Sequence, residues 1–348
     1  MTNPSPLHIN PQRLQTAYHL LQEAVSGGEL PVGLLAVANR QETLRCEAYG
    51  PEGPIGTDGL YWIASITKPI VATAVMQMVE QGRLLLEDPV VRYIPEFGVN
   101  GKTRVTVWHL LTHTSGMADD YWQDPGPEPS ARADLEGALQ THLRFPPGSR
   151  FEYCNVSFRI LGEILRRLSG TSYQQYLQEE VFVPAGMVDT SFQPEPAKRS
   201  RILPVRDFPE VPGGMEGFMA LAMPGGGLFS TAADLVAFGQ SFLNGGMGKH
   251  GRVLGAASLR VMTALYTQGI CRYGDGEPEY WGLGWEKAVP REARLVSPSG
   301  FGHGGMAGTY LWIEPEYDLA IVFLTNHAGL DGRVRKGIVN AVMAAVEL

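Results

Sequence analysis

Apolar residues recur at helical intervals in three long stretches of the chain. These are residues 11–26, where a pair of glycines ends the pattern, residues 66–81, and residues 334–346. Pro69 is tolerated only in the first turn of a helix, so the second helix has to begin close to residue 66. The first and last stretches are apolar on one side, which predicts helices that pack on a core.

Four shorter stretches are continuously apolar or alternate between apolar and polar residues, as β-strands do. Residues 33–38 and 43–49 flank four polar residues, and residues 309–314 and 319–324 flank residues 315–318. Because a short turn joins the strands of each pair, we expect two β-hairpins.

Two capping patterns predict helix starts in the middle of the chain. Thr171 with Gln174, and Thr231 with Asp234, have the spacing in which a side-chain oxygen accepts a hydrogen bond from a free helix N–H. We expect these residues to be structural.

These elements predict an α+β fold. The first hairpin and the late strands form one antiparallel sheet, flanked by the N- and C-terminal helices, and a mainly helical region is inserted between them. We expect a discontinuous sheet domain of residues 10–80 and 226–348, a helical region of residues 81–225, and an active site at their junction.

The composition is that of an ordinary globular protein, with 348 residues, 44% of them hydrophobic and 18% charged. A net charge of −8 and the lack of a long basic run argue against binding of nucleic acid. The three cysteines are widely spaced and show no metal-binding pattern, so we expect free thiols, no metal and no cofactor.

The N-terminal residues contain neither a basic segment nor an apolar core, so they do not look like a signal peptide. No run of 18 or more apolar residues exists to span a membrane. We therefore expect a cytoplasmic protein with no membrane span; the alternative is an exported form whose leader has been removed.

The first candidate for chemistry is Ser65, the one serine in the chain with a lysine three residues later. Residues three apart share a helix face, so the Lys68 amine is expected beside the Ser65 hydroxyl. An amine that burial keeps partly neutral can take the hydroxyl proton and activate the serine as a nucleophile. The structural alternative is a capping serine with a lysine on a solvated helix face.

Two further motifs lie downstream. Tyr153-Cys154-Asn155 precedes a helical pattern over residues 157–168, and His303-Gly304-Gly305 precedes the strand of residues 309–314. A second His-x-Gly, at His327, follows the last strand and is expected in a loop.

The order Ser-x-x-Lys, Tyr-x-Asn, His-x-Gly resembles the serine β-lactamase and penicillin-binding superfamily. The resemblance is strongest to its tyrosine-based, class C-like branch, which includes DD-peptidases, D-aminopeptidases and esterases. Further stretches fit the family, namely residues 110–117, 145–148, 184–187 and 225–231, and the resemblance spans roughly residues 14–347. It implies the same fold, with the nucleophile at the junction of the two regions.

The resemblance also implies roles for the motif residues. Ser65 would attack the substrate carbonyl and become acylated. Lys68 and Tyr153 would share the work of the base, with Tyr153 relaying the proton to the leaving group. Asn155 would hydrogen-bond Lys68 and the acyl side of the substrate.

The tetrahedral intermediate needs two hydrogen-bond donors. One would be the amide of Ser65, and by family analogy the other is the amide of Met306 on the edge strand. Gly304 and Gly305 would let the strand backbone approach the substrate closely. His113, in the loop after the nucleophile helix, is expected to be a structural hydrogen-bonding residue.

The chain departs from β-lactamases at His303, where that family carries a lysine that recognises the β-lactam carboxylate. A histidine is mostly neutral at pH 7. The sequence therefore favours a serine hydrolase for a carboxylic ester or a small amide or peptide, with esters first because they need less leaving-group assistance.

Two alternatives remain open. The site could hydrolyse β-lactams or form a long-lived acyl-enzyme, as a penicillin-binding sensor or scaffold does, or it could pass the acyl group to an acceptor other than water. The polar stretch of residues 119–130, with Trp122, could line a substrate cleft or be a solvated loop. The sequence gives no nucleotide site and no sign of the oligomeric state.

Overall fold

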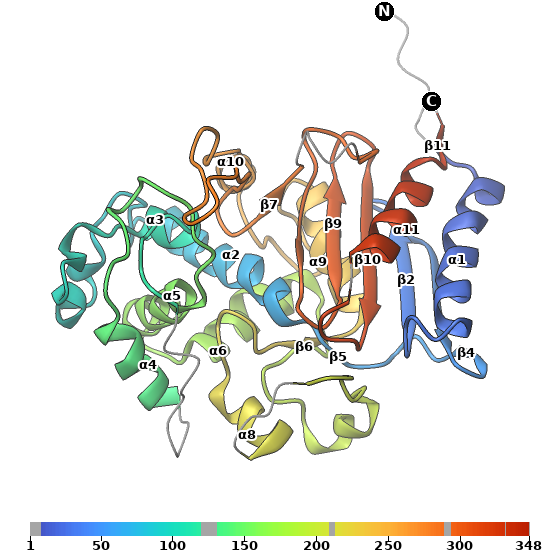
Figure 1. Ribbon diagram of the computed structural model, residues 1–348, viewed down its shortest axis with the longest axis horizontal. Coiled ribbons are helices and arrows are strands. Elements are labelled where there is room, and N and C mark those ends of the chain that lie inside the picture. Colours follow the sequence, from blue (N-terminus) through green and yellow to red (C-terminus); the bar gives the residue numbers. More distant parts are fainter. Residues whose placement is uncertain (1–7, 120–130, 209–212, 289–293, 331, 348) are drawn as a thin grey trace, which may run out of the picture.

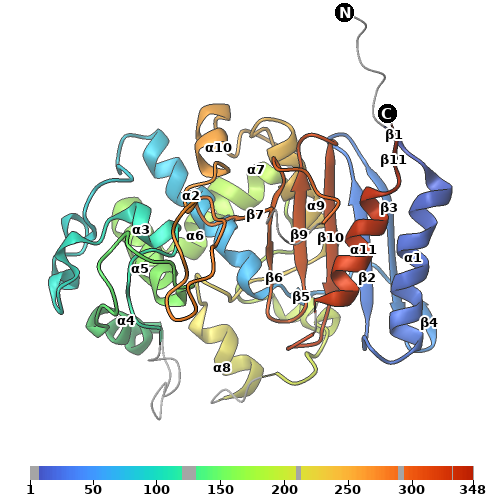
Figure 2. The same ribbon diagram turned by 45° about the horizontal axis from the view of Figure 1, so that its top comes forward.

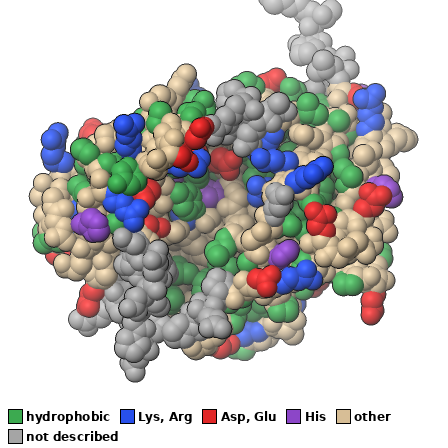
Figure 3. Space-filling view, viewed as in Figure 1, with side chains coloured by type: hydrophobic (Ala, Val, Ile, Leu, Met, Phe, Trp, Pro, Cys, Tyr) green, Lys and Arg blue, Asp and Glu red, His purple; other side chains and the backbone are tan. Residues whose placement is uncertain are grey.

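The structure is a computed structural model that describes residues 8–119, 131–208, 213–288, 294–330 and 332–347. A twisted sheet with helices on both faces forms one side of the molecule, and most of the other helices gather on the opposite side (Figure 1). Figure 3 shows the molecular surface in the same view, and the surface is hollowed between the sheet side and the helical side.

The main sheet has the strand order β4-β3-β2-β10-β9-β8-β7, and every neighbouring pair is antiparallel. It joins the two predicted hairpins, because β2 of the first pairs with β10 of the second. This arrangement confirms the predicted α+β fold. The strands are β2 (Gly33–Ala38), β3 (Thr43–Gly50), β4 (Gly53–Ile55), β7 (Glu286–Lys287), β8 (Phe301–Gly304), β9 (Tyr310–Glu314) and β10 (Leu319–Thr325).

Successive residues of a strand point to opposite faces, so the central strands contribute to two cores. Leu35 and Val37 of β2 lie in the core beneath the first and last helices, whereas Leu34 and Ala36 lie in the core beneath a third helix. These are α1 (Pro11–Ser26), α11 (Arg333–Met343) and α9 (Ala232–Leu243). Figure 2 shows α1 and α11 side by side on one face of the sheet. Because both faces are covered, β2 and β10 are buried throughout.

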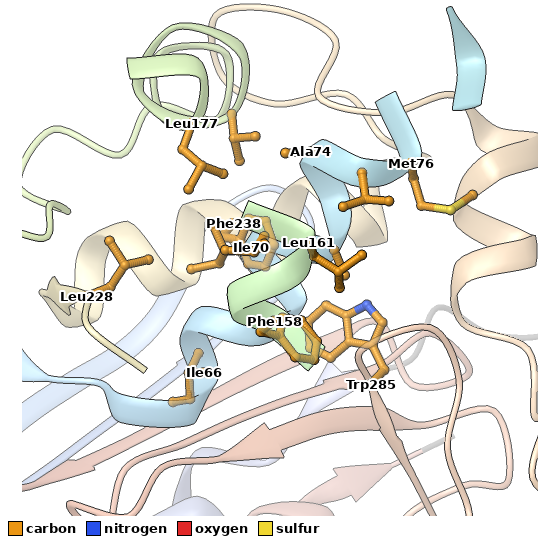
Figure 4. Close-up of a cluster of buried hydrophobic side chains, with 14 of the residues drawn as sticks. Ile66, Ile70, Ala74, Met76, Phe158, Leu161, Leu177, Leu228, Phe238 and Trp285 are labelled. Atoms are coloured by element: carbon orange, nitrogen blue, oxygen red, sulfur yellow. The ribbon is translucent and has the colours of Figure 1, made fainter. Parts of the chain in front are cut away.

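The helix α2 (Thr67–Glu80) runs through the middle of the molecule. Every residue from Thr67 to Met78 is buried, as expected of a helix that is enclosed by other elements. Ile70 of α2 lies among Phe158 and Leu161 of α5 (Asn155–Ser169) and Phe238 of α9, as Figure 4 shows. This packing holds the start of α2 rigidly between the helical side and the sheet side.

The remaining described helices are short and lie mostly on the helical side. They are α3 (Val107–Leu111), α4 (Ala131–Gln140), α6 (Tyr173–Leu177), α7 (Val183–Ala185), α8 (Gly214–Leu221) and α10 (Ala256–Met262). Two small strand pairs complete the fold, β1 (His8–Ile9) with β11 (Val346–Glu347) and β5 (Tyr61–Trp62) with β6 (Phe229–Ser230).

The structure corrects two local predictions. The last helix ends at Met343 and does not reach residue 346, because Val346 pairs with Ile9 in a strand. The cap of α6 is Ser172, which accepts from the Gln175 N–H at 3.1 Å, and not Thr171. The other predicted cap is confirmed, since the Thr231 side chain accepts from the N–H of Asp234 at the start of α9.

Candidate active site

Ser65 lies in a single 3₁₀ turn, Ala64–Ile66, that leads directly into α2. The residue before it, Ala64, has a φ of 46°, a left-handed conformation that costs a residue with a side chain about 1–3 kcal/mol. The turn is held from both sides, because Thr67 Oγ1 donates to the Ala64 carbonyl at 2.7 Å and the Ile63 N–H donates to the Leu228 carbonyl at 3.0 Å. This strained turn fixes the direction of the Ser65 side chain.

The Lys68 side chain is fully buried and has three oxygen neighbours. Its Nζ lies 3.2 Å from Ser65 Oγ, 2.7 Å from Asn155 Oδ1 and 2.6 Å from the carbonyl oxygen of Gly225. Burial lowers the pKa of Lys68 to about 7, although Asp119 and then Cys154 oppose the shift. Near pH 7 a large fraction of this amine is therefore neutral.

Tyr153 is held against Lys68 and His113. The Lys68 Nζ lies 4.6 Å from the centroid of the Tyr153 ring, and the ring stacks on that of His113. The phenol oxygen is buried and has no hydrogen bond of ordinary geometry among the described residues. Burial raises the pKa of Tyr153 above its usual value, with the neighbouring Ser65 hydroxyl acting in the opposite direction, so the phenol keeps its proton at neutral pH.

Asn155 is the first residue of α5 and connects two ionisable groups. Its Oδ1 accepts from Lys68 Nζ, and its Nδ2 donates to Asp119 Oδ2 at 2.8 Å. Asp119 was not singled out by the sequence, although it begins the polar stretch that we considered as a cleft lining. The rest of that stretch, including Trp122, lies outside the described residues.

His303 lies in β8, close to the other candidate residues. Its ring centroid is 6.1 Å from that of Tyr153 and 5.3 Å from that of Trp281. A carbonyl oxygen can only accept, so Nδ1 carries the proton that is donated to the Gly304 carbonyl at 2.7 Å. Burial, then Lys68 and Arg335, lower the pKa of His303 to about 3, and its buried Nε2 has no partner among the described residues. The ring is therefore neutral, with a lone pair on Nε2.

Gly305 lies where no side chain fits. A Cβ at this position would stand 2.1 Å from Thr309 Oγ1 and 2.4 Å from the Ile63 carbonyl oxygen, whereas the nearest atom to a Cβ at Gly304 would be Arg335 Nη1 at 3.2 Å. The turn after β8 therefore comes into direct contact with the backbone that precedes Ser65.

The prediction that Met306 lies on the edge strand is wrong in two respects. β8 ends at Gly304, and Met306 follows in the turn, with an exposed side chain. β8 is also not the outermost strand, because the two-residue strand β7 pairs with its first two residues, Phe301 and Gly302. The Met306 N–H nevertheless has no acceptor among the described residues.

The structure therefore brings Ser65, Lys68, Tyr153, Asn155 and His303 together around one point. Sequence reasoning missed two of their partners, Asp119 and Gly225, because neither has a fixed spacing from a motif. His327 lies in a loop beside Arg206 and Asp207, and its N–H donates to the Ala307 carbonyl at 3.1 Å, in the turn after β8.

The described part of the chain holds no group of three or more His, Cys, Asp or Glu side chains that could bind a metal ion. Within the same residues, no helix combines the length and the apolar character that crossing a membrane requires.

A protein-family model described as Beta-lactamase matches residues 19–344. The chain is 27% identical over 318 residues to the D-alanyl-D-alanine-carboxypeptidase/endopeptidase AmpH of Escherichia coli K12, covering 86% of this chain and 80% of AmpH. It is 28% identical over 345 residues to the esterase EstB of Burkholderia gladioli, covering 84% of each chain.

Its fold is also that of a solved structure, a penicillin-binding protein homologue from Caulobacter crescentus. The TM-score is 0.82 at 21% sequence identity, and the match covers 98% of this chain and 100% of that one. The resemblance expected from the three motifs is confirmed, and the chain belongs to the beta-lactamase family.

Proposed function

We propose that this protein is a serine hydrolase that forms an acyl-enzyme on Ser65 and acts on a carboxylic ester or a small amide or peptide. The observation that carries the proposal is the position of Lys68 Nζ, 3.2 Å from Ser65 Oγ. A neutral amine has two N–H groups and one lone pair. The oxygens of Asn155 and Gly225 accept the two N–H groups, which leaves the lone pair for the Ser65 proton.

Acylation then proceeds with a balanced transfer of protons. Ser65 Oγ attacks the carbonyl carbon while its proton passes to Lys68 Nζ. The bond to the leaving group breaks as Tyr153 gives that group its phenolic proton, and Lys68 returns its proton to the Tyr153 oxygen. In deacylation, water attacks the acyl carbon and the same two residues move its proton to the departing Ser65 oxygen.

Two backbone N–H groups would stabilise the negative oxygen of the tetrahedral intermediate, those of Ser65 and Met306. The unpaired Met306 N–H and the close contact of Gly305 with Ile63 support this assignment. Each such donor is worth about 2.7–4 kcal/mol of transition-state stabilisation.

The substrate preference rests on His303. Its neutral ring offers no fixed positive charge where β-lactamases carry a lysine, which favours neutral esters over anionic β-lactams. The carboxypeptidase and esterase names of the two relatives fit substrates of this kind. Esters come first because their leaving groups need less protonation than amines.

One observation favours a second candidate, turnover or binding of an anionic β-lactam or peptide. The Arg335 guanidinium lies beside Gly304, and its contact in the described residues is with the Tyr310 ring, 4.5 Å from the centroid. It has no carboxylate partner among those residues, so it could meet a carboxylate of the substrate.

The test begins with covalent labelling. A fluorophosphonate followed by peptide mapping should mark Ser65, and Ser65→Ala should lose turnover of p-nitrophenyl butyrate. Labelling of another residue, or full activity of the variant, contradicts the proposal.

The class of substrate is then decided by kcat/KM for p-nitrophenyl acetate, D-alanine p-nitroanilide and nitrocefin. We expect nitrocefin to be the poorest of the three. Nitrocefin turnover above that of the ester would establish the second candidate, and an acyl-enzyme that forms but does not clear would indicate a penicillin-binding role. Transfer to an added alcohol in preference to water would indicate an acyltransferase.

Two further sequence predictions accompany this proposal. The division into a sheet domain of residues 10–80 and 226–348 and a helical region of residues 81–225 can be tested by limited proteolysis. A cytoplasmic location can be tested by cell fractionation.

A further inference from the structure

Asp119 lies at the end of the loop that follows α3, and its carboxylate is bound to the first turn of α5. Oδ2 accepts from the Asn155 N–H at 2.9 Å and from Asn155 Nδ2 at 2.8 Å, and Oδ1 accepts from the Val156 N–H at 2.9 Å. α5 has no side-chain cap of its own, because its N-cap residue is Cys154. A carboxylate 36 residues earlier in the sequence thus binds the free N–H groups of this helix.

The same carboxylate decides how the Asn155 amide is oriented. A side-chain amide can be turned by half a rotation, which exchanges its oxygen and its nitrogen. An ionised carboxylate has no proton to donate, so only Nδ2 can face Asp119. The oxygen of the amide then has to point the other way, where it meets Lys68 Nζ at 2.7 Å.

We propose that Asp119 is a positioning residue of the acyl-transfer site, which holds Asn155 with its oxygen toward Lys68 and thereby aims the lone pair of the amine at Ser65. This inference rests on the proposed function. A helix cap alone would need only the two backbone hydrogen bonds. The third bond, to the Asn155 side chain, links the cap to the candidate base.

Asp119 is also the charged group that acts on Lys68 from this side. The titratable groups that face Lys68 are Asp119 and His113 from the loop, Tyr153 and Cys154 from the segment before α5, and His303 from β8. Asp119 raises the pKa of Lys68 and so opposes the lowering caused by burial. Its loss should therefore move the titration of Lys68 to lower pH.

The chain contains a matched control in Asp234. This carboxylate is buried, whereas that of Asp119 is half-buried, and it accepts from two consecutive backbone N–H groups and one side chain, those of Val188 and Asp189 at 3.0 and 2.8 Å and Thr190 Oγ1 at 2.7 Å. It lies in α9, and among the described residues its carboxylate accepts no hydrogen bond from the candidate site. Asp119→Asn and Asp234→Asn therefore remove comparable hydrogen bonds, but only one of them acts on Asn155.

The experiment compares Asp119→Asn, Asp234→Asn and the wild type by thermal unfolding and by pH profiles of kcat and KM with p-nitrophenyl butyrate. We expect both variants to be less stable. We expect Asp119→Asn alone to lose about 10- to 100-fold in kcat with little change in KM, the usual cost of a misplaced group. The acidic limb of its profile should also move to lower pH.

A double-mutant cycle tests the route through Asn155. If Asp119 acts by orienting this amide, Asp119→Asn should cost much less kcat in an Asn155→Ala background than in the wild type. Asp119→Ser, which keeps one acceptor oxygen, serves if Asp119→Asn does not fold. The inference is overturned if Asp119→Asn matches Asp234→Asn in kcat and pH profile. It is also overturned if the losses in kcat caused by Asp119→Asn and Asn155→Ala multiply in the double variant. Those outcomes would not contradict the proposed function, whereas an active Ser65→Ala variant would.

Discussion

His113 stacks on Tyr153, with ring centroids 4.4 Å apart and an angle of 26° between the planes. The same histidine accepts the Cys154 N–H on Nδ1 at 3.0 Å, and its carbonyl accepts the Glu152 N–H at 2.9 Å. His113 has a φ of 57°, so this loop conformation is itself strained. Sequence reasoning expected a structural hydrogen-bonding residue, and the structure places it against the candidate proton donor.

His113 stacks on Tyr153 through its ring and accepts the Cys154 N–H through Nδ1, and substitution can separate these two interactions. His113→Asn retains an acceptor but loses the ring, so we expect kcat to fall about 10-fold while much of the stability remains. His113→Phe keeps a ring but leaves the buried Cys154 N–H without an acceptor, which should cost about 1–3 kcal/mol in the free energy of unfolding. Urea unfolding and steady-state kinetics measure both effects, and identical behaviour of the two variants would contradict this division.

Lys68 and Tyr153 should act as one catalytic unit. Lys68→Ala and Tyr153→Phe should each lower kcat by about two to four powers of ten, the range of acid–base catalysis. The double variant should be little worse than the worse single one, because members of one unit are not additive. Losses that multiply would mean that the two residues work independently.

Lys102 provides the control for Lys68. It is also a fully buried lysine, and its Nζ donates to the carbonyls of Leu139 at 3.0 Å and Thr141 at 2.5 Å. Lys102→Ala should therefore destabilise the protein without lowering kcat of the folded fraction.

The rate of hydrolysis should depend on pH through Lys68. The proposed mechanism makes the neutral amine the active form, and its pKa lies at about 7, so kcat/KM should rise with pH and level off above that value. His303, with a pKa lowered to about 3, is already neutral across this range and should not contribute. A profile that is flat between pH 5.5 and 8 would contradict the assignment of Lys68 as the base.

Stability should fall in acid because of the two buried histidines. Burial lowers the pKa of His113 well below its usual value and that of His303 to about 3, so only the unfolded chain binds these protons just below pH 6.5. The loss should be about 1.4 kcal/mol per histidine for each pH unit below 6.5. Urea unfolding at pH 7.5, 6.0 and 5.0 should show a smaller loss for His303→Asn.

Two neighbouring glycines should differ sharply in their tolerance of a methyl group. Gly305→Ala would bring Cβ into the Ile63 carbonyl, and the backbone has to shift at the turn that carries the Met306 N–H. We expect a loss of about 100-fold or more in kcat, as for a displaced oxyanion donor. In Gly304→Ala the one tight contact of the methyl group is with the flexible end of Arg335, and the Tyr310 ring lies at an ordinary van der Waals distance of 3.8 Å. We therefore expect kcat to change less than about 3-fold. Equal effects of the two variants would argue against close packing at Gly305.

Local patterns predicted much of the fold because they depend on neighbouring residues. Proline and glycine mark both ends of α1, and the polar turn of residues 39–42 predicts the β2–β3 hairpin. The prediction for α6 failed because adjacent Thr171 and Ser172 are both good caps, and the choice between them depends on tertiary packing.

The candidate site was predictable only where its residues have a fixed spacing. Ser65 and Lys68 are three apart on one helical segment, so their proximity follows from helix geometry. The Gly225 carbonyl and the Asp119 carboxylate reach the site by tertiary folding, and no local pattern indicates them. Met306 was placed on the edge strand by family analogy, and such an analogy does not tell where a strand of this chain gives way to a turn.

The burial of α2 from Thr67 to Met78 has a consequence for how the protein loses its structure. The helix is enclosed by the strands and α9 on one side and by α5 on the other, so neither the sheet side nor the helical side can unfold while the candidate nucleophile Ser65 stays in place. Partial unfolding that spares activity should therefore be rare, and loss of activity should coincide with loss of secondary structure during denaturation. Hydrolytic activity would then report on the cooperativity of the whole chain.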